Sequence, residues 1–176
     1  MRELSGAVLV GASYGGLVIT GLAERAAERL SHLVYVDAYV PRNGETWLDL
    51  LPAKRADELR ERAATQEDGW RVPCPSLSSF GLSERDFVWI SRRTSPQPFA
   101  SFTQPVQLSD PLAAAIPRTY IRCTENRGLQ DQGERARSMA DWRYREIATS
   151  HLPMLTEPAR LAQLLLEVGD PMATGC

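Results

Sequence analysis

The pentapeptide Gly-Ala-Ser-Tyr-Gly at residues 11–15 most constrains the fold, because it sets Ser13 between two glycines at the end of an apolar run. That run, residues 7–10, is typical of a strand buried on both faces of a sheet. After it, apolar residues recur at helical spacing, at Leu17, Val18, Leu22, Ala26 and Leu30. A Gly-x-Ser-x-Gly turn between a strand and a helix is tight enough to require small residues at positions 11 and 15, and Gly16 adds room for close packing. We therefore predict a strained turn that lifts the Ser13 hydroxyl above the sheet.

The simplest alternative is a glycine-rich turn in which the serine has no chemical role. A phosphate-binding loop is a second alternative, because such loops also join a strand to a helix. The chain contains neither a Gly-Lys-Ser/Thr sequence nor a Gly-x-Gly-x-x-Gly pattern. A reactive serine is therefore favoured over both.

Strands and helices alternate along the rest of the chain. We expect further strands at residues 33–36, 119–123 and 144–147, and a last helix at residues 157–168 with one apolar face. Alternation of this kind is typical of a mainly parallel sheet. The prediction is an α/β fold of about four strands with flanking helices, formed by one domain over residues 1–176.

The segment from about residue 45 to 116 differs in pattern and is predicted to be an inserted, helical lid. It begins with a polar helix at residues 53–64 and continues with turn-rich sequence that holds half of the chain's twelve prolines. It also contains large aromatic residues, namely Trp47, Trp70, Phe80, Phe87, Trp89, Phe99 and Phe102. These residues favour a hydrophobic substrate, or they form the core of the lid itself.

Composition narrows the classes of partner. A net charge of −2 and a pI near 5.8 give no electrostatic reason to bind nucleic acid or an anionic membrane surface. No apolar stretch approaches the length of a membrane span, and the N-terminal residues do not resemble a signal peptide. The three cysteines lack metal-ligand spacing. We expect a cytoplasmic protein that acts on a small molecule and needs no cofactor or metal.

A serine hydroxyl becomes a good nucleophile only when a neighbouring base takes its proton, and histidine is the usual base near neutral pH. The chain has two histidines. His32 comes just before the second strand, at the end of the sheet opposite Ser13, so we expect a structural role. His151 follows the fourth strand, at the carboxyl end where open α/β sheets place their sites. His151 is therefore the predicted base.

Three segments together resemble a branch of the α/β-hydrolases that contains plant methylesterases, hydroxynitrile lyases and bacterial esterase-like proteins. They are residues 10–16, residues 33–38, and Ser-His-Leu-Pro-Met-Leu at residues 150–155. The resemblance covers nearly the whole chain. It implies that Ser13 is the nucleophile, that His151 is the base, and that the backbone N–H of Tyr14 stabilises the oxyanion.

The acid of the triad departs from this resemblance. The family normally places an aspartate after the strand at residues 119–123, and by spacing Asn126 falls at that position. An asparagine can orient an imidazole but does not stabilise its charged form as a carboxylate does. Glu125, Asp131 and Asp37 are the candidate substitutes. Glu125 is adjacent to Asn126. Asp37 follows the second strand, where a structural role in capping the loop is at least as well supported as a role as the acid.

The second departure concerns the strands that precede the serine turn in this family, because here that strand begins a few residues after Met1. We expect a partial fold that lacks the N-terminal strands and leaves an apolar strand edge exposed. Such an edge pairs readily with another strand. The expected partner is a second copy of the chain, giving a homodimer, or a separate N-terminal chain.

These features lead to three hypotheses about function. The first is a serine hydrolase acting on a small hydrophobic ester, lactone or thioester. The second is a non-hydrolytic enzyme, a lyase, cyclase or eliminase of small-molecule metabolism, which a weakened triad would favour. The third is a non-catalytic remnant that binds a ligand without turnover.

Overall fold

The computed structural model describes residues 4–65, 69–74, 77 and 80–169. The chain divides into two compact units. One contains Met1–Val40 together with Gln107–Cys176, and the other is Pro41–Val106. Of the segment expected to be a lid, residues 45–106 belong to the second unit and residues 107–116 to the first. Its role as a lid stays a prediction.

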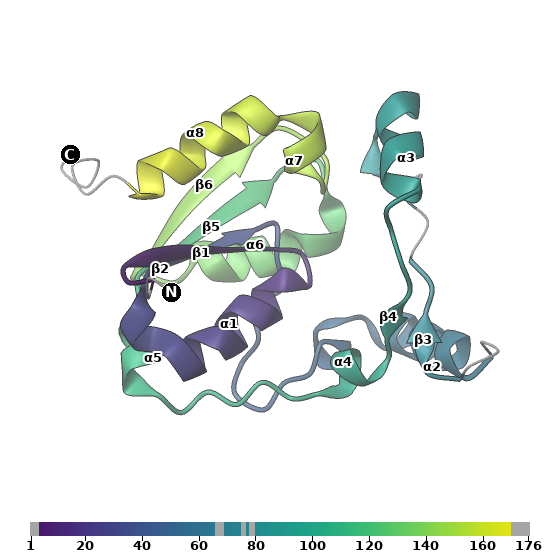
Figure 1. The fold of residues 1–176 in the computed structure, drawn as a ribbon, viewed down its shortest axis with the longest axis horizontal. Coiled ribbons are helices and arrows are strands. Elements are labelled where there is room, and N and C mark those ends of the chain that lie inside the picture. The colour runs from purple at the N-terminus through teal and green to yellow at the C-terminus, as the bar shows by residue number, and fades with distance from the viewer. Residues whose placement is uncertain (1–3, 66–68, 75–76, 78–79, 170–176) are drawn as a thin grey trace. The chain divides into compact units, whose positions relative to one another are not determined.

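The first unit is built on a four-stranded sheet in the order β1-β2-β5-β6 (Figure 1). Its strands are β1 (Ala7–Ala12), β2 (Leu30–Val36), β5 (Arg118–Cys123) and β6 (Trp142–Ile147). All three neighbouring pairs run parallel. The predicted α/β class and parallel four-stranded sheet are confirmed, and the carboxyl ends of all four strands lie at one edge.

Side chains alternate between the two faces of the sheet along each strand, so both faces carry apolar residues. Helices cover both faces. Leu33 and Tyr35 of β2 contribute to one core cluster, and Val34 and Val36 contribute to the other. The first cluster lies beneath α1 (Gly15–Ala26), α5 (Pro111–Ala115) and α6 (Gln130–Arg137). The second lies beneath α8 (Pro158–Gly169), which follows the short α7 (Pro153–Thr156). Figure 1 shows these layers. Short 3-10 turns stand at Ala27–Arg29 and Arg127–Leu129.

The second unit has its own secondary structure and a small core. It contains a 3-10 turn (Leu48–Leu50), α2 (Ala53–Thr65), α3 (Glu84–Ser91), α4 (Ala100–Thr103), and β3 (Arg71–Val72) paired antiparallel with β4 (Gln97–Pro98). The rings of Trp47 and Phe102 lie 4.3 Å apart, and Phe99 meets Phe102 edge-on. These aromatic residues pack within the unit. By contrast, Trp70, Phe87 and Trp89 are exposed.

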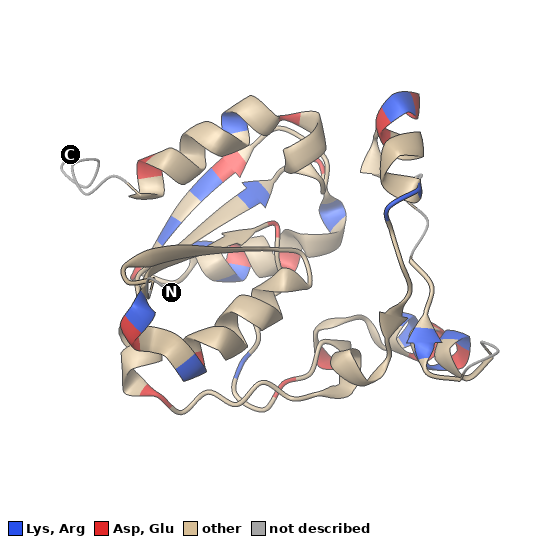
Figure 2. Ribbon diagram, viewed as in Figure 1, with Lys and Arg blue, Asp and Glu red and all other residues tan. Residues whose placement is uncertain are grey.

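Charged positions of both signs are interspersed over the ribbon of each unit (Figure 2). In the part of the chain that the structure describes, no helix is both long and apolar enough to cross a membrane. The expectation of a small-molecule substrate, with no nucleic acid or membrane partner, stays a prediction.

The edge of β1 bears on the expected assembly. Among the described residues β1 pairs with β2 alone, and its residue Val10 is 42% exposed. An unpaired apolar edge favours pairing with another strand. We expect a dimer that persists at low micromolar concentration in light scattering. A monomer that stays in solution at that concentration would contradict pairing between two copies.

Candidate active site

The turn between β1 and α1 holds Ser13 in a left-handed backbone conformation, with φ of 53°. That region is uncommon for residues other than glycine and persists only where surrounding contacts enforce it. Here the Ser13 N–H donates to the Val36 carbonyl (3.2 Å), and the Ser13 carbonyl accepts from the N–H groups of Gly16 and Tyr39 (both 3.1 Å). The turn is therefore fixed to the end of β2 and the loop that follows it.

Two glycines allow this close approach. A Cβ at Gly11 would lie 2.5 Å from the Gly15 carbonyl oxygen, and one at Gly16 would lie 2.0 Å from the Tyr39 carbonyl oxygen. A Cβ at Gly15 would meet no atom within 4 Å outside its own helix. The expectation that position 15 requires a small residue is thus wrong for this chain. The requirement falls on positions 11 and 16, where other backbone segments pack against the turn.

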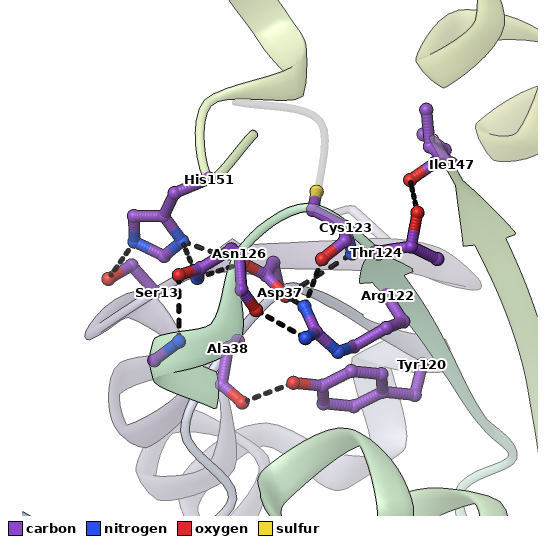
Figure 3. A network of polar contacts seen from close by, with 11 residues as sticks. Ser13, Asp37, Ala38, Tyr120, Arg122, Cys123, Thr124, Asn126, Ile147 and His151 are labelled. Carbon is purple, nitrogen blue, oxygen red and sulfur yellow. Dashed lines mark hydrogen bonds and ion pairs between the residues drawn. The ribbon is translucent and has the colours of Figure 1, made fainter. Parts of the chain in front are cut away.

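His151 lies in the loop between β6 and α7, and its Nε2 is 2.9 Å from the Ser13 Oγ (Figure 3). Its side chain is 11% exposed. The two residues are far apart in the sequence, and the common edge of the parallel sheet brings them together. This is the hydrogen bond that a base needs in order to take the proton of a serine hydroxyl.

The carboxylate beside His151 belongs to Asp37, directly after β2. Its Oδ2 is 2.7 Å from the His151 Nδ1, and the residue is completely buried. Like Ser13 it has a positive φ, of 42°, and its N–H donates to the Ile121 carbonyl (2.7 Å). Serine, histidine and aspartate thus form one continuous chain of hydrogen bonds (Figure 3). Serine hydrolases on several unrelated folds share this arrangement.

Asn126 lies next to the same oxygen. Its Nδ2 donates to the Asp37 Oδ2 (2.6 Å) and is 3.0 Å from the His151 Nδ1, while its Oδ1 accepts from the Gly128 N–H (3.0 Å). When His151 Nδ1 carries a proton, both nitrogens are donors, and Asp37 Oδ2 is the acceptor they share. The sequence spacing predicted Asn126 beside the imidazole of His151, and Asn126 does lie there. The carboxylate that contacts the imidazole, however, is that of Asp37, which follows β2 and not β5.

The other two acid candidates lie elsewhere. The side chain of Glu125 is exposed, and its backbone N–H donates to the Thr149 carbonyl (3.1 Å). Asp131 is exposed in the first turn of α6. The structure brings together Ser13, His151, Asn126 and Asp37, and it does not bring the carboxylates of Glu125 and Asp131 to them.

Tyr14 directly follows Ser13 as the N-cap of α1, and its carbonyl accepts from the Leu17 N–H (3.0 Å). Its backbone N–H therefore lies next to the serine at the positive end of a helix. Its predicted role towards an oxyanion stays a prediction.

Two further ionisable groups surround Asp37. Burial raises the pKa of the Cys123 thiol to about 12, and the negative charge of Asp37 adds to the shift. Burial and the same charge also raise the pKa of the Tyr120 hydroxyl, which donates to the Ala38 carbonyl (3.0 Å). Both groups are neutral near pH 7. In the described part of the chain, no group of three or more His, Cys, Asp or Glu residues could hold a metal ion.

His32 has a different environment. It is a buried residue within β2, and its Nε2 is 2.8 Å from the Thr119 Oγ1. Burial lowers its pKa from 6.5, and the positive charge of Arg143 lowers it further. This is the environment of a neutral structural histidine.

We expect His32→Gln to leave catalysis within about twofold of the wild type but to change the pH dependence of stability. Because the pKa of His32 is lower in the folded chain, the unfolded chain binds more protons below pH 6.5. The stability contribution of His32 is therefore present above pH 6.5 and is lost as the pH falls towards the folded pKa. Thermal unfolding at pH 7.5 and 5.5 should show a larger loss for the wild type than for the variant. Equal losses would contradict this assignment.

A model of the "Alpha/beta hydrolase family" matches residues 2–164. The carbendazim hydrolyzing esterase of Nocardioides sp. is 36% identical over 129 residues, which cover 68% of this chain and 52% of that protein. The putative methylesterase 11, chloroplastic, of Arabidopsis thaliana is 25% identical over 92% of this chain and 45% of its own length. Methylesterase 7 of the same plant is 24% identical over 94% of this chain and 70% of its own length. The chain thus spans about half the length of the first two relatives.

Solved structures share the fold. An extracellular alpha/beta-hydrolase from a Paenibacillus species superposes with a TM-score of 0.81 at 20% identity, covering 94% of this chain and 72% of that one. Tomato methylketone synthase I superposes with a TM-score of 0.76 at 20% identity, covering 96% and 72%. The pyrethroid hydrolase PytH superposes with a TM-score of 0.71 at 21% identity, covering 99% and 74%.

Proposed function

The chain belongs to the alpha/beta hydrolase family, and we propose that it is a serine esterase whose nucleophile is Ser13. The observation that carries the proposal is the uninterrupted hydrogen-bonded chain from Ser13 through His151 to the buried Asp37. The names of the relatives, a carbendazim hydrolyzing esterase and two methylesterases, also support ester hydrolysis.

The geometry supports a two-step acyl transfer. Ser13 Oγ attacks the carbonyl carbon of the ester while its proton passes to His151 Nε2, and the backbone N–H of Tyr14 stabilises the oxyanion. His151 then gives the proton to the departing alcohol. Water then attacks the carbonyl carbon of the acyl-serine and loses a proton to His151. His151 returns this proton to Ser13 Oγ as the acyl–serine bond breaks and the carboxylic acid leaves. In both steps Asp37 holds the imidazole in the productive tautomer and stabilises its charged form.

We propose a small hydrophobic ester, lactone or thioester as the substrate class. The hydrophobic character is supported by the aromatic content of the sequence between about residues 45 and 116, and the ester by the names of the relatives. The test is turnover of p-nitrophenyl acetate, butyrate and octanoate, of a γ-lactone and of a short acyl thioester. Hydrolysis of at least one class, absent in Ser13→Ala, is the expected result. No turnover of any class by the folded protein would contradict the proposed function.

Hydrolysis is favoured over lyase or cyclase chemistry and over a non-catalytic role. The lyase or cyclase alternative gained support from an acid position occupied by Asn126. The direct contact of the Asp37 carboxylate with His151 supports Asp37 as the acid of the proposed triad, and that support for the alternative is then lost.

Asn126→Asp should lower esterase activity. The new carboxylate would lie about where the Asn126 amide now donates to Asp37, and two carboxylates at this distance do not both ionise readily. The shared negative charge would also bind His151 in its protonated form, so activity should fall by about tenfold or more at neutral pH and recover in part at higher pH. The measurement is kcat/KM between pH 6 and 9. An increase at every pH would show that residue 126, and not Asp37, is the position of the acid.

A further inference from the structure

The Arg122 side chain lies directly behind Asp37, on the side away from His151, and the acyl-transfer mechanism does not use it (Figure 3). Arg122 comes from β5 and is only 6% exposed, although arginine is rarely this buried. Its side chain runs against α6, where a Cβ at Gly133 would lie 2.5 Å from the Arg122 Cδ. The chain thus encloses a full positive charge next to the candidate triad.

The guanidinium contacts three parts of the site at once. Nη1 donates to the Asp37 Oδ1 (2.8 Å) and also to the Cys123 carbonyl, and Nη2 donates to the Asn126 carbonyl. These contacts join the carboxylate to the end of β5 and to the loop that presents the Asn126 amide. The forked, planar donor geometry of arginine suits this, since one group serves several acceptors in fixed directions.

The two oxygens of Asp37 are divided between these partners. Oδ1 accepts from Arg122 and from the Cys123 N–H (3.2 Å), whereas Oδ2 is shared by His151 and the Asn126 amide. Fixing Oδ1 sets the rotation of the carboxylate. Oδ2 is thereby directed at the imidazole.

We propose that Arg122 is a positioning residue of the triad, which directs Asp37 at His151 and, through its charge, weakens the hold of Asp37 on the protonated imidazole. This inference rests on the proposed function of the triad. An aspartate alone would favour the charged form of its histidine strongly. A cation on the far side of the carboxylate offsets part of that attraction.

Among the described contacts of Asp37, the permanent positive charge is that of Arg122. The ionisable residues that the described contacts bring to Asp37 are Arg122, Cys123 and Tyr120 of β5 and His151 of the loop after β6. Cys123 and Tyr120 have raised pKa values and are neutral over the pH range of an assay. Arg122 remains charged throughout that range.

The test is an NMR titration of the imidazole of His151, which requires no substrate. The chain has two histidines, so His32→Gln assigns the signals. In Arg122→Met the midpoint of His151 should rise by about one pH unit, as expected for the loss of a charge several ångströms away in a partly buried site. Arg122→Lys should restore the midpoint, because it keeps the charge. A midpoint unchanged in Arg122→Met would overturn the charge effect.

The matched control is Arg118, another arginine of β5. Its guanidinium donates to the carbonyls of Ala113 and Ala114 instead of a carboxylate. Arg118→Met should leave the His151 midpoint where it is in the wild type. An equal rise in both variants would show a general loss of positive charge rather than a specific effect of Arg122, and would overturn the proposal.

A second variant covers the case in which Arg122→Met does not fold. Gly133→Ala keeps every charge but displaces the Arg122 arm, so the His151 midpoint should rise by a smaller amount and kcat should fall with little change in KM. A midpoint and a kcat both equal to wild type in the folded Gly133→Ala would also overturn the proposal. If the wild type shows no ester turnover, the proposed function fails while the titration still decides the role of Arg122.

Discussion

Ser13→Ala is expected to abolish ester hydrolysis, with a loss in kcat of about 10⁴-fold or more. The variant loses the nucleophile but keeps the backbone contacts that fix the turn, which are made by main-chain atoms. His151→Ala should cause a similar loss. Because the two residues act as one unit, the double variant should be scarcely worse than either single one.

The measurement is the steady-state kcat of Ser13→Ala, His151→Ala and the double variant, with circular dichroism to confirm that each is folded. His32→Ala is the control, since His32 contacts Thr119 and not the triad. Residual kcat in Ser13→Ala within tenfold of the wild type would refute Ser13 as the nucleophile. Equal losses at both histidines would refute the assignment of the base.

Asp37→Asn should lower kcat by about 10⁴-fold with little change in KM, as the equivalent replacement does in other serine triads. The substitution keeps the shape of the side chain but removes the charge that stabilises the imidazolium. It also turns one acceptor oxygen into a donor, which faces either His151 or the guanidinium of Arg122. The catalytic loss therefore has both an electrostatic and a tautomeric cause.

Glu125→Gln and Asp131→Asn are the matched controls, because each neutralises an exposed carboxylate that was an acid candidate from the sequence. Both should retain kcat within about twofold. Asp37→Asn also leaves a buried arginine without its counter-charge, so a lower melting temperature is expected. Kinetics should therefore be measured well below that temperature. A greater loss of kcat in Glu125→Gln than in Asp37→Asn would show that the acid is Glu125, in the loop after β5, and not Asp37.

The sequence sufficed wherever local pattern determines structure. The apolar run before Ser13 and the helical spacing after it predicted β1 and α1. The expected strand at residues 33–36 corresponds to the last part of β2, and those at 119–123 and 144–147 lie within β5 and β6. Parallel strands share a carboxyl edge, so residues that follow different strands were expected to converge there.

The identity of the acid could not be read from local pattern. Spacing counts residues from the end of one strand and so selected Asn126, but which strand end reaches the imidazole depends on the order β1-β2-β5-β6. Asp37 also looked like an ordinary loop residue, because its complete burial and its positive φ are properties of the folded chain alone. One signal was available: an aspartate directly after an apolar run is well placed at the catalytic edge.

The sequence did not indicate a role for Arg122 for a similar reason. An arginine within a strand is usually taken as a solvent-facing residue, and only the packing of α6 shows that this one is enclosed. The crowding at Gly16 likewise comes from the Tyr39 backbone, which follows a different strand.

Active-site labelling measures whether His151 and Asp37 activate Ser13. The folded protein would be treated with a fluorophosphonate, and the adduct located by intact mass and peptide mapping. A single adduct on Ser13 is expected, formed much more slowly in Asp37→Asn and absent in Ser13→Ala. If the folded wild type forms no adduct, or carries it on another residue, Ser13 is not the activated nucleophile.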